Sequence, residues 1–206
     1  MEPGARDQLE KQVRALCDRG DYAAAATLTL RGYGPEILGF LLATHVSEPE
    51  AEDVFAELSE VLWRGLPSFA WDSSLRTWSY AVARFVSRTL RRNSARQRRR
   101  EGRVDESALE EIVQAARTET QSFLRTEKRR RLDALRNNLS MEDRALLVLR
   151  VDRKLEWNEL ARILLESDEG ASPETAVLAR EAARLRKRFQ LVKERLRERA
   201  KRERVA

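Results

Sequence analysis

The chain has 206 residues, of which 36% are charged and only 6% aromatic, and its 40 Lys and Arg against 34 Asp and Glu give a net charge of +6. A single cysteine, Cys17, excludes a disulfide framework and a thiolate metal cluster. No run of about 18 apolar residues exists, which excludes an ordinary transmembrane helix. The N-terminus carries acids and lacks the apolar segment of a signal peptide. We therefore expect a cytoplasmic protein without membrane insertion, and the positive charge fits a nucleic-acid partner.

The charge is divided unevenly along the chain. Seven acidic residues lie between Glu36 and Glu60, whereas basic residues dominate from Arg76 onward. Such asymmetry in a small protein suggests two different partner surfaces. With only 8 Gly, 5 Pro and few alternating, strand-like patterns, the chain is predicted to be all-α.

The first part of the chain is expected to contain several helices. Residues 7–30 carry apolar residues at helical spacing and are predicted to form one or two short helices, and residues 37–43 another. Pro49 opens the next helix, because the acidic residues around it suit the positive end of a helix dipole. That helix is expected to end at Gly65 and Pro67.

A loop with two large aromatic residues precedes the most informative helix. Phe69 and Trp71 lie in the loop Arg64–Ser74, which is too short to bury much. The helix that follows, Leu75–Arg100, has one apolar stripe, and its arginines fall largely outside that stripe. Such a helix suits a polyanion, because each guanidinium can form two hydrogen bonds with a phosphate. The alternative is a solvated basic face with Trp78 in the core.

A break in periodicity separates this helix from the second half. The pattern lapses over residues 101–107, and helical spacing resumes over residues 109–139. We therefore predict two helical domains joined by a linker. The predicted ranges are an N-terminal helical extension (1–29), a helical bundle (30–100), the linker (101–127) and a C-terminal domain (128–206).

The C-terminal domain is predicted to be a helix-turn-helix module. Ser140 is expected to cap a buried helix over residues 145–151, and a second helix over residues 155–165 follows. Ser172 and Pro173 are expected to start a final helix of about 45 Å. In a helix-turn-helix module this last helix would enter the major groove of DNA. The alternative is an ordinary helical hairpin with a basic face, and the loop is longer than the usual tight turn.

The residues that catalysis needs are scarce. His45 is the only histidine, and a surface position is expected for it rather than a catalytic one. The chain has no G-x-S-x-G motif and no glycine-rich phosphate loop. The acidic residues Glu52, Asp53 and Glu57 are interpreted as a solvated helix face, because no His or Cys lies near them. We expect a protein that is not an enzyme and has no metal or cofactor.

Four segments, in this order and spacing, are similar to parts of one known family: Ala51–Phe69 (AEDVFAELSEVLWRGLPSF), Leu75–Arg84 (LRTWSYAVAR), Leu132–Leu164 and Leu185–Leu196 (LRKRFQLVKERL). The chain resembles the extracytoplasmic-function (ECF) sigma factors, the smallest specificity subunits of bacterial RNA polymerase, over residues 30–200. In that family the first segment binds the polymerase clamp and the second melts the promoter. The last two correspond to the lead-in and the recognition helix of the module that binds the −35 element.

The resemblance implies a transcription initiation factor that directs core RNA polymerase to specific promoters, with catalysis left to the polymerase. The implied partners are core polymerase, through its clamp helices and flap, promoter DNA and an anti-sigma factor. The implied polymerase contacts are Asp53, Phe55, Glu57 and Leu58, and Phe55 and Leu58 are equally suited to the core. The implied DNA contacts are Trp71, Arg76, Trp78, Tyr80, Arg84, Arg88, Arg91, Arg92, Arg180, Arg184, Arg186, Lys187 and Arg188.

The chain departs from the family pattern in the segment for the −10 element. Phe85 stands where the family usually has Asn, and Thr89 where it often has Asp, so the resemblance does not extend to −10 specificity. Ala81 and Val82 replace tryptophans that housekeeping sigma factors use in melting, as is common in the ECF class. Fewer stacking side chains should make promoter opening depend more on a well-matched promoter.

Two other functions fit the same arginines. A stand-alone helix-turn-helix regulator would bind DNA without engaging the polymerase, and it would have no need for the acidic helix around Asp53. An RNA-binding or ribosome-associated helical protein would use the arginines on RNA.

Overall fold

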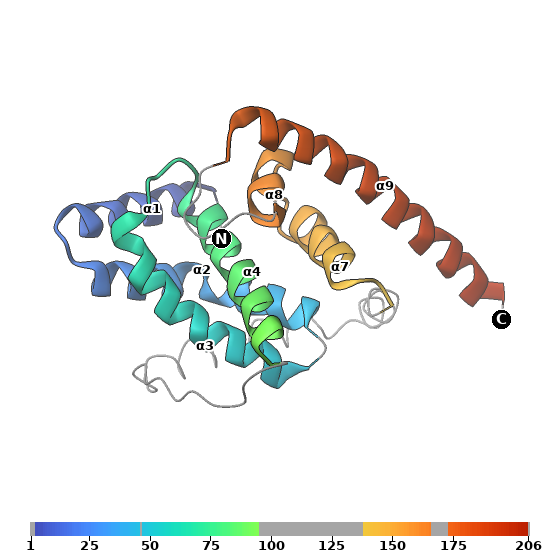
Figure 1. Ribbon diagram of the computed structural model, residues 1–206, viewed down its shortest axis with the longest axis horizontal. Helices are drawn as coiled ribbons and strands as arrows, with labels where there is room; N and C mark the ends of the chain where they lie inside the picture. The colour runs from blue at the N-terminus through green and yellow to red at the C-terminus, as the bar shows by residue number, and fades with distance from the viewer. Residues whose placement is uncertain (1–2, 46, 95–137, 166–172, 206) are drawn as a thin grey trace.

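The computed structural model describes residues 3–45, 47–94, 138–165 and 173–205. Within these ranges the chain is all-α, as predicted, and contains no strand. The predicted linker, residues 101–127, lies outside the described residues, as does most of the predicted helix 109–139. The elements are α1 (Pro3–Asp18), α2 (Tyr22–Thr44), α3 (Glu48–Gly65), the 3₁₀ turn η1 (Leu66–Ser68), α4 (Leu75–Ser94), α7 (Met141–Leu147), the π-helical η2 (Val148–Asp152), α8 (Trp157–Leu164) and α9 (Thr175–Val205) (Figure 1).

Helix α2 is one continuous helix where two separate segments were predicted. It runs through Gly32 and Pro35, residues that disfavour a helix interior. Buried side chains on both sides of the proline, among them Tyr33 and Ile37, hold the helix together by packing. At Gly32 a side chain would collide with Leu9, so the glycine lets α1 approach α2 closely.

Helix α3 begins and ends as the local sequence predicts. The Ser47 hydroxyl accepts a hydrogen bond of 3.4 Å from the backbone N–H of Glu50, and Pro49 lies in the first turn. The helix ends at Gly65, and η1 follows. The loop after η1 buries more aromatic surface than was expected. Phe69 is only 8% exposed and stacks on Trp78 of α4 with ring centroids 4.7 Å apart.

The helices α7 and α8 also follow local capping rules. The Ser140 hydroxyl accepts a hydrogen bond of 3.2 Å from the backbone N–H of Asp143, which confirms the predicted cap. Glu156 and Glu159 form a reciprocal capping box at the start of α8. The predicted buried run 145–151 forms the end of α7 and most of η2, and its last residue, Val151, is 48% exposed.

Helix α9 begins at Thr175, two residues after the predicted start at Pro173, while Ser172 lies outside the described residues. Its 31 residues span about 46 Å. Leu178 and Leu185 bury its first half in the core against α8. Its C-terminal end projects from the rest of the molecule (Figure 1).

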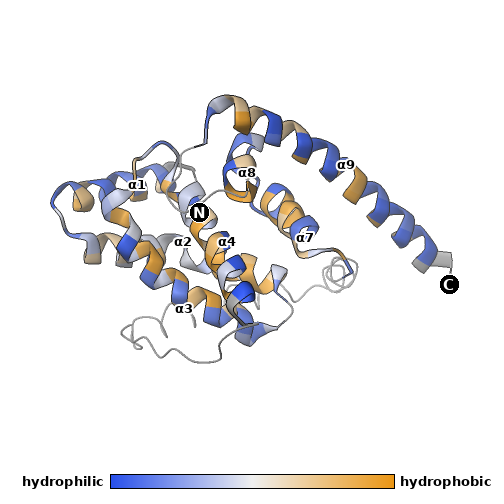
Figure 2. Ribbon diagram, viewed as in Figure 1, coloured by the Kyte–Doolittle hydropathy of each residue, from blue (hydrophilic) through white to orange (hydrophobic). Residues whose placement is uncertain are grey.

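The buried side chains of both halves form one contiguous apolar cluster. Helix α4 contacts α2 and α3 on one side and α8 on the other, and α2 also contacts α7. The apolar sides of these helices face one another, as the colouring of Figure 2 shows. The described parts of the two predicted domains therefore pack directly against each other.

Candidate nucleic-acid interface

The first arginine of α4 forms a buried ion pair. Arg76 is 6% exposed, and its guanidinium forms two hydrogen bonds with the Glu36 carboxylate of α2, at 2.6 and 3.1 Å. The same guanidinium donates a hydrogen bond of 3.2 Å to the backbone carbonyl of Arg153. Burial by itself lowers the pKa of Arg76. The hydrogen bonds to Glu36 and the negative charge of Glu36 act in the opposite direction, so the pKa of Arg76 is raised overall. In this arrangement Arg76 joins three parts of the fold and is not accessible to DNA.

Tyr80 is internal as well. It is fully buried, its ring packs edge-on against Phe40 at 5.4 Å, and its hydroxyl donates a hydrogen bond of 3.4 Å to the backbone carbonyl of Glu36. Of the arginines farther along α4, Arg84 is buried, Arg88 is half-buried, and Arg91 and Arg92 are exposed near the end of the helix. The predicted DNA contacts on α4 therefore divide into an internal group and an accessible group.

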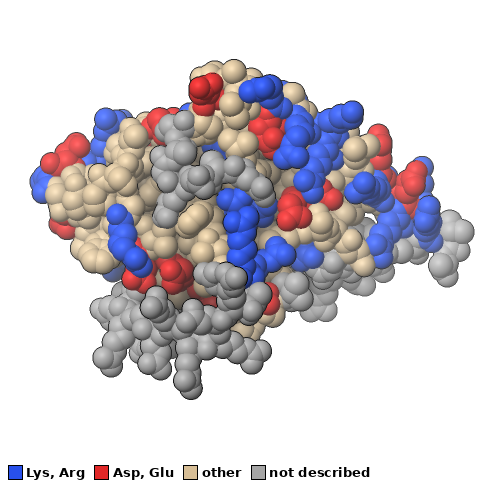
Figure 3. Space-filling model, in the orientation of Figure 1, with Lys and Arg blue, Asp and Glu red and all other residues tan. Residues whose placement is uncertain are grey.

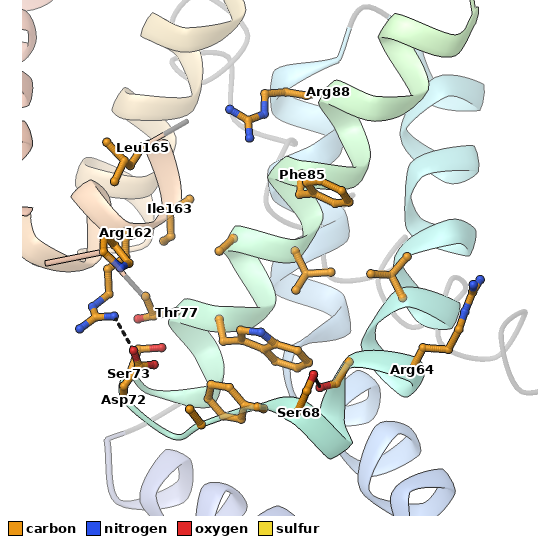
Figure 4. A pocket seen from close by; sticks show the side chains of 18 of the residues that line it. Arg64, Ser68, Asp72, Ser73, Thr77, Phe85, Arg88, Arg162, Ile163 and Leu165 are labelled. Carbon is orange, nitrogen blue, oxygen red and sulfur yellow. Dashed lines mark hydrogen bonds and ion pairs between the residues drawn. The ribbon is translucent and has the colours of Figure 1, made fainter. Parts of the chain in front are cut away.

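A pocket of about 700 Å³ lies between α3, α4 and α8 (Figure 4). Three aromatic rings line it, those of Phe69, Trp78 and Phe85. Phe69 also packs against Trp71, with ring centroids 4.8 Å apart. A second aromatic residue of the loop before α4 therefore contacts the Phe69 ring. Its other lining residues are Glu57, Val61, Arg64, Gly65, Ser68, Ala70, Asp72, Ser73, Thr77, Ala81, Val82, Arg88, Arg162, Ile163, Leu165 and Pro173.

The lining combines aromatic rings with three guanidinium groups and the carboxylates of Glu57 and Asp72, and its rings suit a flat, partly apolar group. Aromatic rings stack with nucleobases, and guanidinium groups pair with phosphates. Arg64, Arg88 and Arg162, from three different helices, lie among the lining residues (Figure 4), and Arg64 pairs with Glu60 while Arg162 pairs with Asp72. The hydroxyls of Ser68 and Ser73 add hydrogen-bonding groups among the lining residues.

One wall of the pocket comes from α8, which is fastened to α4 and its preceding loop. The Thr77 hydroxyl donates a hydrogen bond of 2.8 Å to the Glu159 carboxylate. The Arg162 guanidinium lies 3.2 Å from the Asp72 carboxylate, as the dashed line in Figure 4 marks. Sequence reasoning did not find Glu159 and Arg162, because their role depends on a contact between segments about 85 residues apart.

The basic residues of α9 that were predicted to contact DNA differ in their partners and exposure. Arg188 lies 2.6 Å from the Asp143 carboxylate of α7, and Arg184 lies 2.7 Å from Glu181 within α9. The guanidinium of Arg186 lies 5.6 Å from the ring centroid of Trp157. Arg180, Arg184, Arg186 and Lys187 are all exposed, and Arg188 is half-buried. On the face shown in Figure 3, Lys and Arg side chains follow α9, with acidic side chains between them.

The four predicted polymerase contacts lie on α3, and two of them are buried and two exposed. Phe55 and Leu58 are fully buried and belong to the core, the alternative considered for them. Asp53 and Glu57 are exposed. Trp63, on the same helix, is 50% exposed, which makes it one of the most exposed large apolar side chains among the described residues.

His45 is buried, with 5% of its surface exposed, and the prediction of a surface position is wrong. Its Nε2 atom lies 2.7 Å from the Ser87 hydroxyl of α4, and its Nδ1 atom lies 3.7 Å from the Glu50 carboxylate of α3. Its backbone carbonyl accepts a hydrogen bond of 3.5 Å from Arg144 of α7. Burial lowers the pKa of His45, although Glu50 acts in the opposite direction.

A scan of the chain against models of known protein families finds no match, and a comparison with curated proteins finds none either. Within the described ranges, no group of three or more His, Cys, Asp or Glu side chains is arranged to hold a metal ion. None of the helices that the structure describes has the length and apolar character needed to cross a membrane.

Glu36→Gln should destabilise the fold strongly, because it leaves the Arg76 charge buried without its counter-ion. The expected loss is about 3–5 kcal/mol in the free energy of unfolding, measured by chemical denaturation. Glu60→Gln is the control, because Glu60 pairs with Arg64 at the surface, and it should cost at most about 1 kcal/mol. Equal losses in the two variants would contradict the role given to Arg76.

Mild acid should destabilise the protein through His45. Its pKa lies below the ordinary value of 6.5 in the folded chain, so the unfolded chain binds more protons below that pH. The free energy of unfolding should therefore fall between about pH 7 and 5, and it should fall less in His45→Gln.

The control for this measurement is Ser79→Ala, which removes another buried hydroxyl of α4, leaves the hydrogen bond of His45 to Ser87 in place and should retain a wild-type pH dependence. Because His45 is the only histidine, no other side chain has its ordinary pKa in this range. The same pH profile for wild type and His45→Gln would refute the prediction.

Proposed function

We propose that the chain is an RNA polymerase sigma factor of the extracytoplasmic-function type. In this proposal it binds core polymerase, directs it to specific promoters and takes part in opening the DNA, while RNA synthesis belongs to the polymerase. The observation that carries the proposal is the pocket with aromatic and guanidinium groups between α3, α4 and α8. A regulator that binds only duplex DNA has no need for such a pocket, because paired bases remain stacked within the double helix.

In this function, the pocket holds an unpaired base of the −10 element. Stacking on Trp78 or Phe85 contributes about 1–3 kcal/mol per base, and Arg88 pairs with a neighbouring phosphate. The hydroxyl oxygens of Ser68 and Ser73 accept hydrogen bonds from the base edge, because their protons are donated to the backbone carbonyls of Gly65 and Ser74. Because only an unpaired base can enter, binding favours the open promoter over the closed one.

Helix α9 contacts the −35 element as the second helix of a helix-turn-helix module, with α8 before it. Its exposed basic residues pair with phosphates and fix the orientation of the helix in the major groove. The exposed acidic residues of α3, Asp53 and Glu57, contact the basic clamp helices of core polymerase, and the exposed ring of Trp63 adds apolar area to that contact.

The proposal includes two domains that separate when the promoter is bound. The −35 and −10 elements lie about 25 base pairs apart, which corresponds to about 85 Å of straight duplex. Helix α9 spans only about 46 Å, and α8 is fastened to α4 by the contacts of Glu159 and Arg162. Binding both elements at once therefore requires the part with α7, α8 and α9 to leave α4. This removes the α8 wall of the pocket and leaves the base contacts to Trp78, Phe85 and Arg88 of α4. The predicted linker, residues 101–127, lies between the two parts in the sequence.

A pocket for unpaired bases is equally suited to single-stranded RNA, so RNA binding is the second candidate. The exposed carboxylate of Asp53 on α3, which lies outside the pocket, favours the sigma factor, because negative charge repels a nucleic-acid backbone and attracts a basic protein surface. An anti-sigma factor that regulates the chain is part of the proposal.

Binding to core polymerase and promoter-directed transcription test the function together. The purified chain is mixed with bacterial core polymerase, and the complex is supplied with genomic promoter fragments. A stable complex that starts RNA synthesis at defined sites is the expected result. No complex with core, or no initiation from any fragment, would refute the proposal, and tighter binding to RNA than to promoters at the same salt concentration would favour the second candidate.

Reversing the charge of the acidic residues on α3 should weaken the complex with core polymerase. Asp53→Lys with Glu57→Lys is expected to reduce affinity at least about tenfold, measured by competition with the wild-type chain. Both residues are exposed, so the free energy of unfolding should change by less than about 1 kcal/mol. The control, Asp7→Lys with Asp18→Lys, makes the same charge change on exposed residues of α1 and should bind core normally. Equal affinity of the two double variants would contradict the assignment.

Holding α8 against the loop before α4 should abolish promoter-directed transcription. Cys17 is first replaced by Ser, and Asp72→Cys and Arg162→Cys then place two thiols where the ion pair joins the two parts. A cleavable cross-linker between these thiols is expected to stop initiation, and cleavage is expected to restore it. The variant with Asp72→Cys alone, treated in the same way, should remain active. Full activity of the cross-linked chain would show that the parts need not separate.

A further inference from the structure

His45 lies where the two parts of the molecule meet, the first part being α1 to α4 and the second part α7 to α9. It is buried at the end of α2, and its Nε2 atom lies 2.7 Å from the Ser87 hydroxyl of α4. Its backbone carbonyl accepts a hydrogen bond of 3.5 Å from the guanidinium of Arg144, which belongs to α7. The histidine is therefore part of the direct contact between α2 and α7.

The first part holds an acceptor for a proton on this imidazole. The Nδ1 atom of His45 is buried and forms no hydrogen bond with any described residue, although the Glu50 carboxylate of α3 lies 3.7 Å away. A neutral imidazole carries one N–H donor, whereas an imidazolium carries one on each nitrogen. A movement of about 1 Å brings Glu50 within hydrogen-bond distance of the second donor. The first part can therefore stabilise His45 in its charged form.

The second part brings a positive charge to the same place. Arg144 is buried, and its guanidinium lies against the backbone of His45. The two carboxylates that precede it in α7 do not offset this charge at the imidazole, because Asp143 is paired with Arg188 of α9 at 2.6 Å and Glu142 is exposed. A charged imidazole would therefore face a like charge across the contact between α2 and α7, in surroundings that exclude most of the water.

The influences on the imidazole divide between the two parts. Burial lowers the pKa of His45 most, the charges of Arg91 on α4 and Arg144 on α7 lower it as well, and Glu50 raises it. Glu50 and Arg91 are exposed and stay with the first part when the two parts move apart. Arg144 and a share of the burial are removed when α7 leaves. The packed form therefore binds this proton more weakly than a form in which the parts are separated.

We propose that protonation of His45 shifts the chain toward a form in which the second part has left the first and both remain helical. Glu50 holds the imidazolium on one side and Arg144 repels it on the other, so the contact between α2 and α7 is the one that weakens. The contacts of α8 with α4 set how many chains are separated at neutral pH. Because one proton is involved, the ratio of separated to packed chains rises by at most about tenfold per pH unit.

This switch does not depend on the chain being a sigma factor, but its consequence for transcription rests on the proposed function. That function requires the two parts to separate before both promoter elements are bound. A fall in pH then favours the form that binds a promoter, and the proton acts as an inducing signal. The response belongs between about pH 7 and 5, where an imidazole takes up its proton.

Energy transfer between two dyes tests the separation in the full-length chain without polymerase or DNA. Cys17 is replaced by Ser, and the dyes are attached at Gln8→Cys on α1 and Asn158→Cys on α8, because both side chains are exposed. Energy transfer is measured between about pH 8 and 5, and circular dichroism monitors the helix content. His45 is the only histidine, so the NMR signals of its ring report its protonation in the same samples.

The wild-type chain should lose energy transfer in the pH range in which His45 titrates, at constant helix content. His45→Gln cannot take up the proton and should keep its energy transfer throughout. Glu50→Gln removes the acceptor for the second N–H, so its transition should move to lower pH. The matched control is Glu60→Gln, which makes the same charge change about 15 Å farther along α3 and should keep the wild-type transition.

Constant energy transfer while the imidazole titrates would overturn the inference and leave the proposed function standing, because that function concerns separation on the promoter. Equal transitions in Glu50→Gln and Glu60→Gln would also overturn it. A loss of helix content together with energy transfer would contradict it, because the chain would then unfold instead of separating. If His45→Gln is separated at every pH, the imidazole is needed for packing, and the comparison of the two glutamate variants decides.

Discussion

The ion pair between Arg76 and Glu36 holds the start of α4 in place, and the candidate site depends on that placement. A guanidinium with 6% exposure is stable there only because a carboxylate and a backbone carbonyl satisfy its hydrogen bonds. The pair joins α2 and α4 to Arg153, the residue after η2, and so connects both halves of the chain. With the start of α4 held in this way, Trp78 lies against Phe69, and the pocket forms beside them.

The need to pair a buried charge also explains where the other charged residues lie. Arginines that face a neighbouring helix, such as Arg162 and Arg188, are paired with carboxylates, because an unpaired charge at a packed interface is costly. The side chains left on the surface, among them Asp53 and Lys187, are the ones available to partners. The contacts of α8 with α4 therefore have two effects: they complete one wall of the pocket, and they tie together the two parts that the proposed function needs to separate.

The local sequence predicted helix starts that are decided by interactions between neighbouring residues. The starts of α3 and α7 were predictable, because Ser47 and Ser140 each cap the helix that follows within three residues. The prediction failed at Pro35, where packing of buried neighbours keeps α2 continuous, and at His45, which three other helices enclose. In both places the deciding contacts come from distant segments.

By itself the sequence determined that the described chain is all-α, where helices such as α3 and α7 begin, and that α4 and α9 are rich in arginine. Helical spacing and caps are properties of neighbouring residues, so they can be read before the fold is known. Only the tertiary structure decided that Arg76 and Tyr80 are internal, that Phe69, Trp78 and Phe85 line one pocket, and that His45 lies in the contact between α2 and α7. The spacing of a helix shows which residues share a side, but what packs against that side depends on segments far away in the chain.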